Sequence, residues 1–179
     1  MSNPNGLRHI VRYVTGHNED DGISVFQTTV DNNPPAREFP DGMKIFDYYL
    51  TQGFPVDVAA AKDIRAYEHL IQDPPGIVVP DGSAARIVDL PPAYTSPMHR
   101  SMSLNYNFVI EGEVEVLLDS GETRTLKPGD GLVQRAVNHA WRNTSEMKWA
   151  RITAVVLPVQ GFQVRGQEGK MSRGTEGEK

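Results

Sequence analysis

Two stretches decide the fold of this chain: Pro97-Met-His-Arg-Ser-Met-Ser-Leu-Asn-Tyr-Asn-Phe-Val-Ile-Glu-Gly112 and Pro128-Gly-Asp-Gly-Leu-Val-Gln-Arg-Ala-Val-Asn-His-Ala-Trp-Arg-Asn143. The first is typical of a β-strand that ends in a Glu-Gly turn. The second begins with a Pro-Gly-Asp turn and continues as two short strands. Both stretches therefore predict antiparallel strands joined by tight turns.

Alternation along these strands gathers polar side chains on one face. Successive residues of a strand point to opposite faces, so the first stretch presents together His99, Ser101, Ser103 and Asn105. The second presents together His139, Trp141 and Asn143. Two histidines on separate strands, each with polar neighbours on its own face, predict one pocket inside a β-barrel.

The first stretch resembles the first sequence motif of the cupins, usually written G-x5-H-x-H-x3/4-E-x6-G. His99 stands at the first His position, and Gly112 follows at the expected spacing. Ser101 replaces the second His, and Asn105 replaces the Glu. The resemblance is therefore to a cupin whose metal-binding motif is degenerate.

The second stretch resembles the second cupin motif, usually written G-x5-P-x-G-x2-H-x3-N. Gly129 begins it, and the spacing from His139 to Asn143 is intact. Gln134 stands for the Pro and Ala136 for the Gly, with one residue fewer after Gly129. The pair of motifs resembles the small single-domain cupins of the RmlC-like superfamily. This implies an all-β fold, the cupin double-stranded β-helix or jelly-roll barrel, with N-terminal strands and one short helix.

Length and composition bound the remaining possibilities. A chain of 179 residues is most simply one domain. Without cysteine it has no disulfide and no thiolate chemistry. A net charge of −5 offers no basic footprint for nucleic acid or an anionic membrane. No signal peptide or membrane-spanning run is visible, so we expect a cytoplasmic protein.

Three segments are expected along the chain. Residues 1–79 should form N-terminal strands and a short helix packed on the barrel, residues 80–162 the cupin barrel, and residues 163–179 a mobile polar tail. The N-terminal strands are predicted at 7–15, 23–30 and 43–52. The barrel strands are predicted at 84–90, 100–110, 113–118, 122–127, 131–135, 139–143 and 148–157.

Residues 57–71 differ from the strands around them. Apolar residues recur at helical spacing, and Asp57 is placed to cap the start of a helix. Two interpretations stay open for this segment. It covers one end of the barrel as ordinary packing, or it forms a lid over the mouth of the pocket.

The resemblance implies a metal, but the residues present argue against one. Typical cupins hold Fe, Mn, Ni or Zn with three His and one carboxylate, ligands that suit such cations. Here the ligand set would be His99, His139 and Asn105, without an anion. Ligand charge and number set affinity, so we expect either no metal cofactor or one bound weakly.

Without a metal, the same residues suit proton chemistry. His99 and His139 are the candidate acid and base, since imidazole titrates near neutrality. We expect them to act from opposite sides of a bound substrate. Candidate substrate-binding residues are Ser101, Asn105, Gln134, Trp141 and Arg151. A surface or interface ion pair is the alternative role of Arg151.

Three functions follow, in order of preference. The first is a metal-independent isomerase, cyclase, dehydratase or decarboxylase acting on a small aromatic or polyketide-like molecule in natural-product biosynthesis. The second is a metal-dependent dioxygenase or decarboxylase, and the third is a non-catalytic small-molecule-binding cupin. The resemblance also implies a homodimer, with the aromatic-rich strand at 43–52 as the expected interface.

Overall fold

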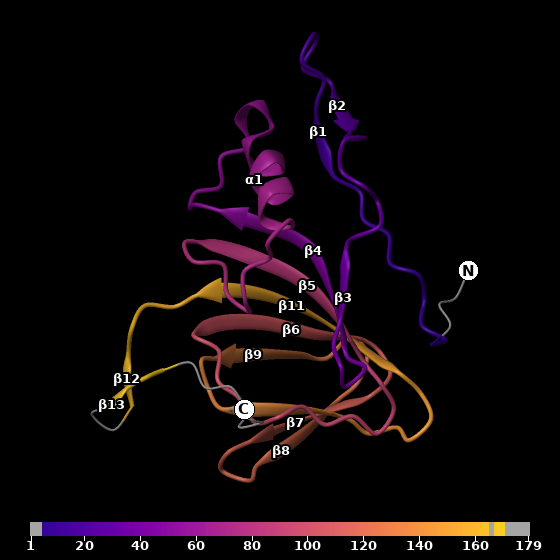
Figure 1. Ribbon diagram of the computed structural model, residues 1–179, viewed down its shortest axis with the longest axis vertical. Helices are drawn as coiled ribbons and strands as arrows, with labels where there is room; N and C mark the ends of the chain where they lie inside the picture. Colours follow the sequence, from indigo (N-terminus) through magenta and orange to yellow (C-terminus); the bar gives the residue numbers. More distant parts are fainter. Residues whose placement is uncertain (1–4, 165–166, 171–179) are drawn as a thin grey trace.

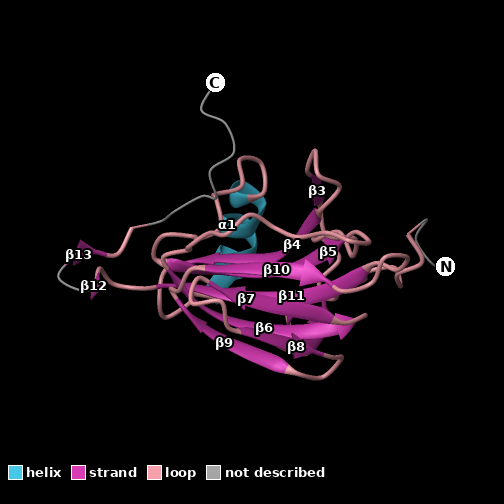
Figure 2. Cartoon of the chain, turned by 90° about the horizontal axis from the view of Figure 1, so that it is seen from below, coloured by secondary structure: helices cyan, strands magenta, loops and turns pink. Residues whose placement is uncertain are grey.

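Two facing antiparallel sheets form the body of the protein. The computed structural model describes residues 5–164 and 167–170. Within them the larger sheet has six strands in the order β3 (Ala36–Glu38), β4 (Lys44–Gln52), β5 (Gly82–Leu90), β11 (Ala150–Pro158), β6 (Ser103–Glu111) and β9 (Gly131–Arg135). The smaller sheet has three, in the order β10 (His139–Asn143), β7 (Val114–Leu118) and β8 (Thr123–Leu126). Figures 1 and 2 show the smaller sheet stacked against part of the larger one.

This arrangement confirms the predicted all-β jelly-roll barrel. Every pairing in both sheets is antiparallel. Single β-bridges from Thr95 to Arg142 and from His99 to His139 lay the segment before β6 along β10. The residues of the first motif therefore extend the smaller sheet before the chain crosses into the larger one.

Strand β6 has an inverted polarity pattern. Its polar residues Ser103, Asn105 and Asn107 are buried, whereas Tyr106 and Phe108 between them are exposed. A strand on a simple apolar core would show the opposite pattern. The interior beside β6 is therefore polar.

The barrel core between the sheets is apolar at one end. Val109 from β6, Val114 and Val116 from β7, Trp141 from β10 and Ile152 from β11 are buried in one cluster. These residues come from both sheets, so the cluster joins them. The alternating apolar residues of β7 account for it.

The helix predicted at 57–71 is confirmed. A single turn at Ala59–Ala61 leads into α1 (Lys62–Leu70). The expected cap by Asp57 is wrong, because the N-cap position of α1 is Ala61 and no side chain caps it. The Asp57 carboxylate instead accepts a hydrogen bond from the Ala59 amide at 2.9 Å, in the preceding turn.

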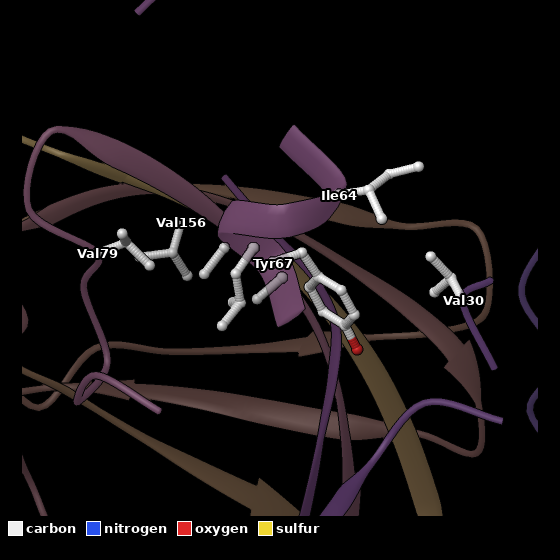
Figure 3. Packing of buried hydrophobic residues seen from close by; sticks show 8 residues of the cluster. Val30, Ile64, Tyr67, Val79 and Val156 are labelled. Atoms are coloured by element: carbon white, nitrogen blue, oxygen red, sulfur yellow. The ribbon is translucent and has the colours of Figure 1, made fainter. Parts of the chain in front are cut away.

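The buried face of α1 packs on the larger sheet. Ile64 and Tyr67 lie in a cluster with residues of β4, β5 and β11: Leu50, Ala84, Ala154 and Val156. Figure 3 shows Tyr67 extending from the helix, with Val79 beside Val156 in the same cluster. This burial supports the packing interpretation of the helix.

The N-terminal strands are shorter than predicted. β1 (Thr15–His17) and β2 (Ser24–Phe26) pair as a small hairpin, and residues 7–14 form no strand. Arg12 holds this segment through its side chain, which donates to the carbonyls of Asp31 and Tyr48 and to the Tyr67 hydroxyl. Side-chain bonds have replaced a backbone ladder here, which an apolar alternation pattern cannot reveal.

A short hairpin follows the barrel near the C-terminal end of the described residues. β12 (Gln163–Val164) pairs with β13 (Gln167–Glu168), inside the segment predicted to be a polar tail. Residues 165–166 and 171–179 of that tail lie outside the described residues. No helix in the described part of the chain is long and apolar enough to cross a membrane.

Two motif residues have structural roles. Gly112 has φ +77° at the turn from β6 to β7, and a Cβ there would lie 2.9 Å from the Ala150 backbone. The Asn143 amide donates to the carbonyls of Leu90, Pro91 and Lys148 at 2.8–3.1 Å. These residues hold the turn and loops at one end of the barrel.

Candidate functional site

The two motif histidines meet in the structure. His99 and His139 are directly opposed across an antiparallel bridge, and each amide donates to the other carbonyl at 2.9 Å. Opposed residues of such a pair place their side chains on one face. Their ring centroids are 4.2 Å apart, and Trp141 stands edge-on to His139 with centroids 6.4 Å apart.

This contact corrects one expectation about the pair. The sequence predicted two imidazoles on opposite sides of a substrate. Rings at 4.2 Å leave no room for a molecule between them. The pair must address a bound molecule from one side.

His139 is held in a defined tautomer. It is 2% exposed, and its Nδ1 lies 3.0 Å from the Val137 carbonyl. A carbonyl only accepts, so Nδ1 carries the hydrogen in the neutral ring. The Gln134 amide nitrogen lies 2.9 Å from Nδ1 and 3.0 Å from Nε2, and in this tautomer Nε2 is the nitrogen that can accept its hydrogen. Both ring nitrogens of His139 are therefore engaged.

Asn107 fixes the orientation of Gln134. Its amide nitrogen donates to the Gln134 Oε1 at 3.3 Å and lies 3.5 Å from the Leu132 carbonyl. With its oxygen occupied, Gln134 turns its amide hydrogens toward His139. The sequence analysis did not select Asn107, although it shares the inner face of β6 with Asn105.

His99 differs from its partner in having one open nitrogen. Its Nδ1 donates to the Pro97 carbonyl at 2.9 Å. Among the described residues none hydrogen-bonds to its Nε2. The ring is only partly buried. His99 can thus exchange a proton with a bound molecule.

The buried position of His139 sets its protonation state. Burial, with a smaller effect of the nearby His99, lowers the pKa of His139 from 6.5 to about 4, against the raising effect of hydrogen bonds with the backbone of Val137 and His99. His139 is neutral at pH 7 as a result.

The depressed pKa of His139 predicts a pH-dependent stability. The unfolded chain binds a proton at this histidine below about pH 6.5, and the folded chain only below about 4. The free energy of unfolding should therefore fall by about 3 kcal/mol as the pH drops from 6.5 to 4. Urea denaturation of the wild type and of His139→Gln measures this. The variant should lose that part of the slope, and parallel curves would contradict the prediction.

Two further polar side chains of the inner face have no partner. Asn105 is 6% exposed and Ser103 is fully buried. The Oδ1 of Asn105 and the Oγ of Ser103 have no hydrogen-bond partner among the residues that the structure describes. Asn105 lies directly opposite Gln134 in the sheet, so both side chains belong to the histidine site. Ser101 is also buried, beside the same strand.

Arg151 is not part of this site. Alternation along β11 turns it away from Ile152 and Ala154, which line the barrel. Its guanidinium forms two hydrogen bonds with Asp89, at 2.6 and 2.7 Å, and lies over Phe46. The ion pair of Arg151 is buried within the chain, with the Arg151 and Asp89 side chains 3% and 0% exposed, and so differs from the surface or interface ion pair expected as the alternative. The substrate-binding role of Arg151 stays a prediction.

The donor set does not fit a firmly bound transition metal. No group of three or more His, Asp or Glu side chains gathers anywhere in residues 5–164 and 167–170. At the histidine pair the donors are imidazole nitrogens, an amide and hydroxyls, all neutral. One imidazole is already hydrogen-bonded at both nitrogens. Without an anionic ligand such a set binds dications weakly.

The fold and the site define a class: a jelly-roll barrel with a polar interior and a buried histidine pair. Comparisons agree. The cupin domain model matches residues 86–156. Phomopsin biosynthesis cluster protein D of Diaporthe leptostromiformis is 40% identical over 96% of this chain and 88% of its own length. The cupin-domain-containing oxidoreductase fogC of Aspergillus ruber is 37% identical, covering 96% and 86%. The chain therefore belongs to the cupin family.

A solved structure shows the same fold at low identity. The cupin domain of Schizosaccharomyces pombe Cnp3 superposes with a TM-score of 0.50 at 12% identity. It covers 83% of this chain and 88% of that one. This likeness concerns the fold alone.

Proposed function

We propose that this protein is a metal-independent cupin enzyme that moves a proton on a small aromatic or polyketide-like molecule, in natural-product biosynthesis. The observation that carries the proposal is the contact between His99 and His139. No group of three or more His, Asp or Glu that could hold a metal ion joins this pair in the described part of the chain. The biosynthesis-cluster names of relatives 40% identical to this chain support the setting.

The roles of the two histidines follow from their hydrogen bonds. His99 gives or takes the proton at its open Nε2. His139, neutral and held by Gln134, is a fixed dipole beside it. Because both rings lie on one side, the proton leaves and returns on the same face of the substrate. This suits an isomerase, cyclase or dehydratase, and a decarboxylase that protonates the carbon left by carbon dioxide.

The surrounding residues bind and stabilise the reacting group. Ser101, Asn105 and Gln134 are buried polar side chains that can hydrogen-bond a developing enolate. Trp141 supplies an apolar wall, edge-on to His139. A substrate held there is shielded from water, which strengthens these hydrogen bonds.

A metal-dependent dioxygenase or decarboxylase is the second candidate. The oxidoreductase names of relatives such as fogC and srdB favour it. Fe, Mn, Ni or Zn would then be held by His99, His139 and Asn105. The neutral donor set argues against this candidate.

The test of the proposed reaction starts from the compound that accumulates when the gene for this protein is deleted from the producing strain. Purified protein stripped of metal should convert this compound in D₂O to a product that carries solvent deuterium and no added oxygen. Mass spectrometry reads both. A product with oxygen incorporated would favour the dioxygenase, and tight binding without conversion would favour a binding cupin.

We also propose that the chain is a homodimer, through a surface other than the one first expected. The aromatics of β4 are used internally: Phe46 lies under Arg151, and Tyr49 stacks on Tyr67 at 4.8 Å. The outer face of β6 and β9 instead exposes an apolar row made of Tyr106, Phe108, Ile110 and Val133. A second copy of the same row would cover it by two-fold symmetry.

Light scattering after size exclusion tests the dimer. We expect a mass of twice 19.9 kDa for the wild type. Replacing Phe108 by lysine puts a charge into the row and should give a monomer. The matched control is Met147→Lys, at a side chain that is 84% exposed in the loop between β10 and β11. This variant should remain a dimer. A monomeric wild type would contradict the proposal.

A further inference from the structure

The inner face of β6 carries two asparagines in contrasting states. The Asn107 amide is satisfied by Gln134 and Leu132. Asn105, two residues earlier on the same face, leaves its Oδ1 buried and unpartnered, and Ser103 does the same with its Oγ. A buried polar group without a hydrogen-bond partner lowers the stability of the folded state. A bound group that hydrogen-bonds both Asn105 and Ser103 would offset this cost.

These two atoms together describe one complementary group. The Asn105 Oδ1 can only accept a hydrogen bond, and the Ser103 hydroxyl can donate one. Residues two apart in a strand have Cα atoms roughly 7 Å apart, a span that a single oxygen between their side chains can bridge. A hydroxyl group both donates and accepts, so it satisfies both. An ether cannot donate, and a carboxylate would place its charge against the Asn105 oxygen.

We infer that Asn105 and Ser103 form a subsite for an uncharged hydroxyl of the substrate, of the phenol or enol type. The inference rests on the proposed function, whose substrate class it narrows. Asn105 lies opposite Gln134, which contacts His139, so the hydroxyl is held next to the histidine pair.

The ligand test compares two fluorinated probes that differ only in the hydroxyl. Binding of 4-fluorophenol and 4-fluoroanisole to the full chain is followed by ¹⁹F NMR at pH 7. We expect the phenol to bind about tenfold more tightly, the worth of one good hydrogen bond in a buried site. Equal affinities, or no binding of the phenol, would overturn the inference.

The variant test separates a binding role from a structural one. Asn105→Leu should erase the preference for the phenol and raise the melting temperature by about 2–5 °C, because it removes an unsatisfied buried amide. The control Asn107→Leu removes a satisfied amide and should lower the melting temperature. A structural Asn105 would lower it as well, with the phenol preference kept, and that result would overturn the inference.

Ser103→Ala provides a second, smaller change should the leucine variant not fold. It should reduce the phenol preference and leave the affinity for the anisole unchanged, and an unaltered preference would count against the subsite. None of these measurements needs turnover. The subsite can therefore fail while the proposed proton transfer stands, and the reverse is also true.

Discussion

Replacing His99 by glutamine is expected to reduce turnover by about 10²–10⁴-fold, the usual worth of a positioned acid or base. His99 is the member of the pair with an open Nε2 and partial exposure, whereas His139 is engaged at both nitrogens. Glutamine retains hydrogen-bonding groups but cannot carry the proton. The measurement is the rate of conversion of the accumulated compound, with folding checked by circular dichroism.

A matched control uses a histidine far from the site. His69 is exposed in the last turn of α1, so His69→Gln should leave the rate unchanged. If His99→Gln kept more than about a tenth of the wild-type rate, general acid–base catalysis by this residue would be ruled out. Full activity in a variant lacking both pocket histidines would remove the proposed function altogether.

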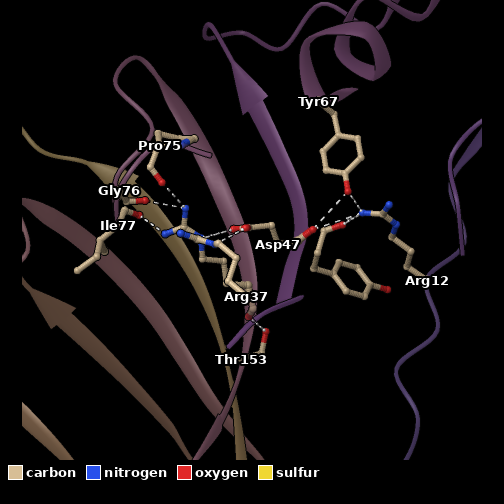
Figure 4. Close-up of polar contacts among 10 residues, drawn as sticks. Arg12, Arg37, Asp47, Tyr67, Pro75, Gly76, Ile77 and Thr153 are labelled. Atoms are coloured by element: carbon tan, nitrogen blue, oxygen red, sulfur yellow. Dashed lines mark hydrogen bonds and ion pairs between the residues drawn. The ribbon is translucent and has the colours of Figure 1, made fainter. Parts of the chain in front are cut away.

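The largest loss of stability is expected from Asp47→Asn. Asp47 and Arg86 form an ion pair at 2.8 Å, with side chains only 2% and 4% exposed. Arg37 bonds the same carboxylate at 3.0 Å, as Figure 4 shows. Arg86 also donates to the Ile77 and Gly76 carbonyls, and so ties the loop before β5 to the sheet.

Removing the carboxylate leaves a buried guanidinium without its counter-charge. Breaking such a pair lowers the free energy of unfolding by about 3–5 kcal/mol. Urea denaturation measures this loss. Glu122→Gln is the control, because its pair with Arg124 is exposed on both sides and contributes little. A loss no greater than that of the control would show that Arg86 is not dependent on Asp47.

The sequence predicts the barrel well, for a physical reason. Strand β6 alternates buried and exposed residues, and the turns at Gly112, Gly121 and Gly129 have the positive φ that glycine favours, so pattern and turn chemistry agree there. The strand predicted at 7–15 is wrong for residues 7–14, because the Arg12 side chain holds this segment in place of backbone hydrogen bonds to a neighbouring strand. No periodicity records a contact between Arg12 and Tyr67, 55 residues away.

The site was only partly predictable. The motif spacing brought His99 and His139 into one site, and alternation placed Asn105, Gln134 and Trp141 with them. The distance between the rings depends on the bridge register, which the sequence does not state. The buried ion pair of Arg151 could not be predicted for a related reason, because its partner Asp89 is 62 residues away in the sequence.

The central claim is proton transfer by a neutral histidine pair without a metal. It is tested most directly by measuring the metal content and the turnover of one sample, purified without an affinity tag and treated with EDTA. We predict full turnover in a sample that contains less than about a tenth of an equivalent of any transition metal. A true catalytic ion is bound tightly, so a metal-dependent enzyme at that metal content would have lost most of its turnover. Loss of turnover on EDTA treatment, restored by one equivalent of Fe, Mn, Ni or Zn, would contradict the claim.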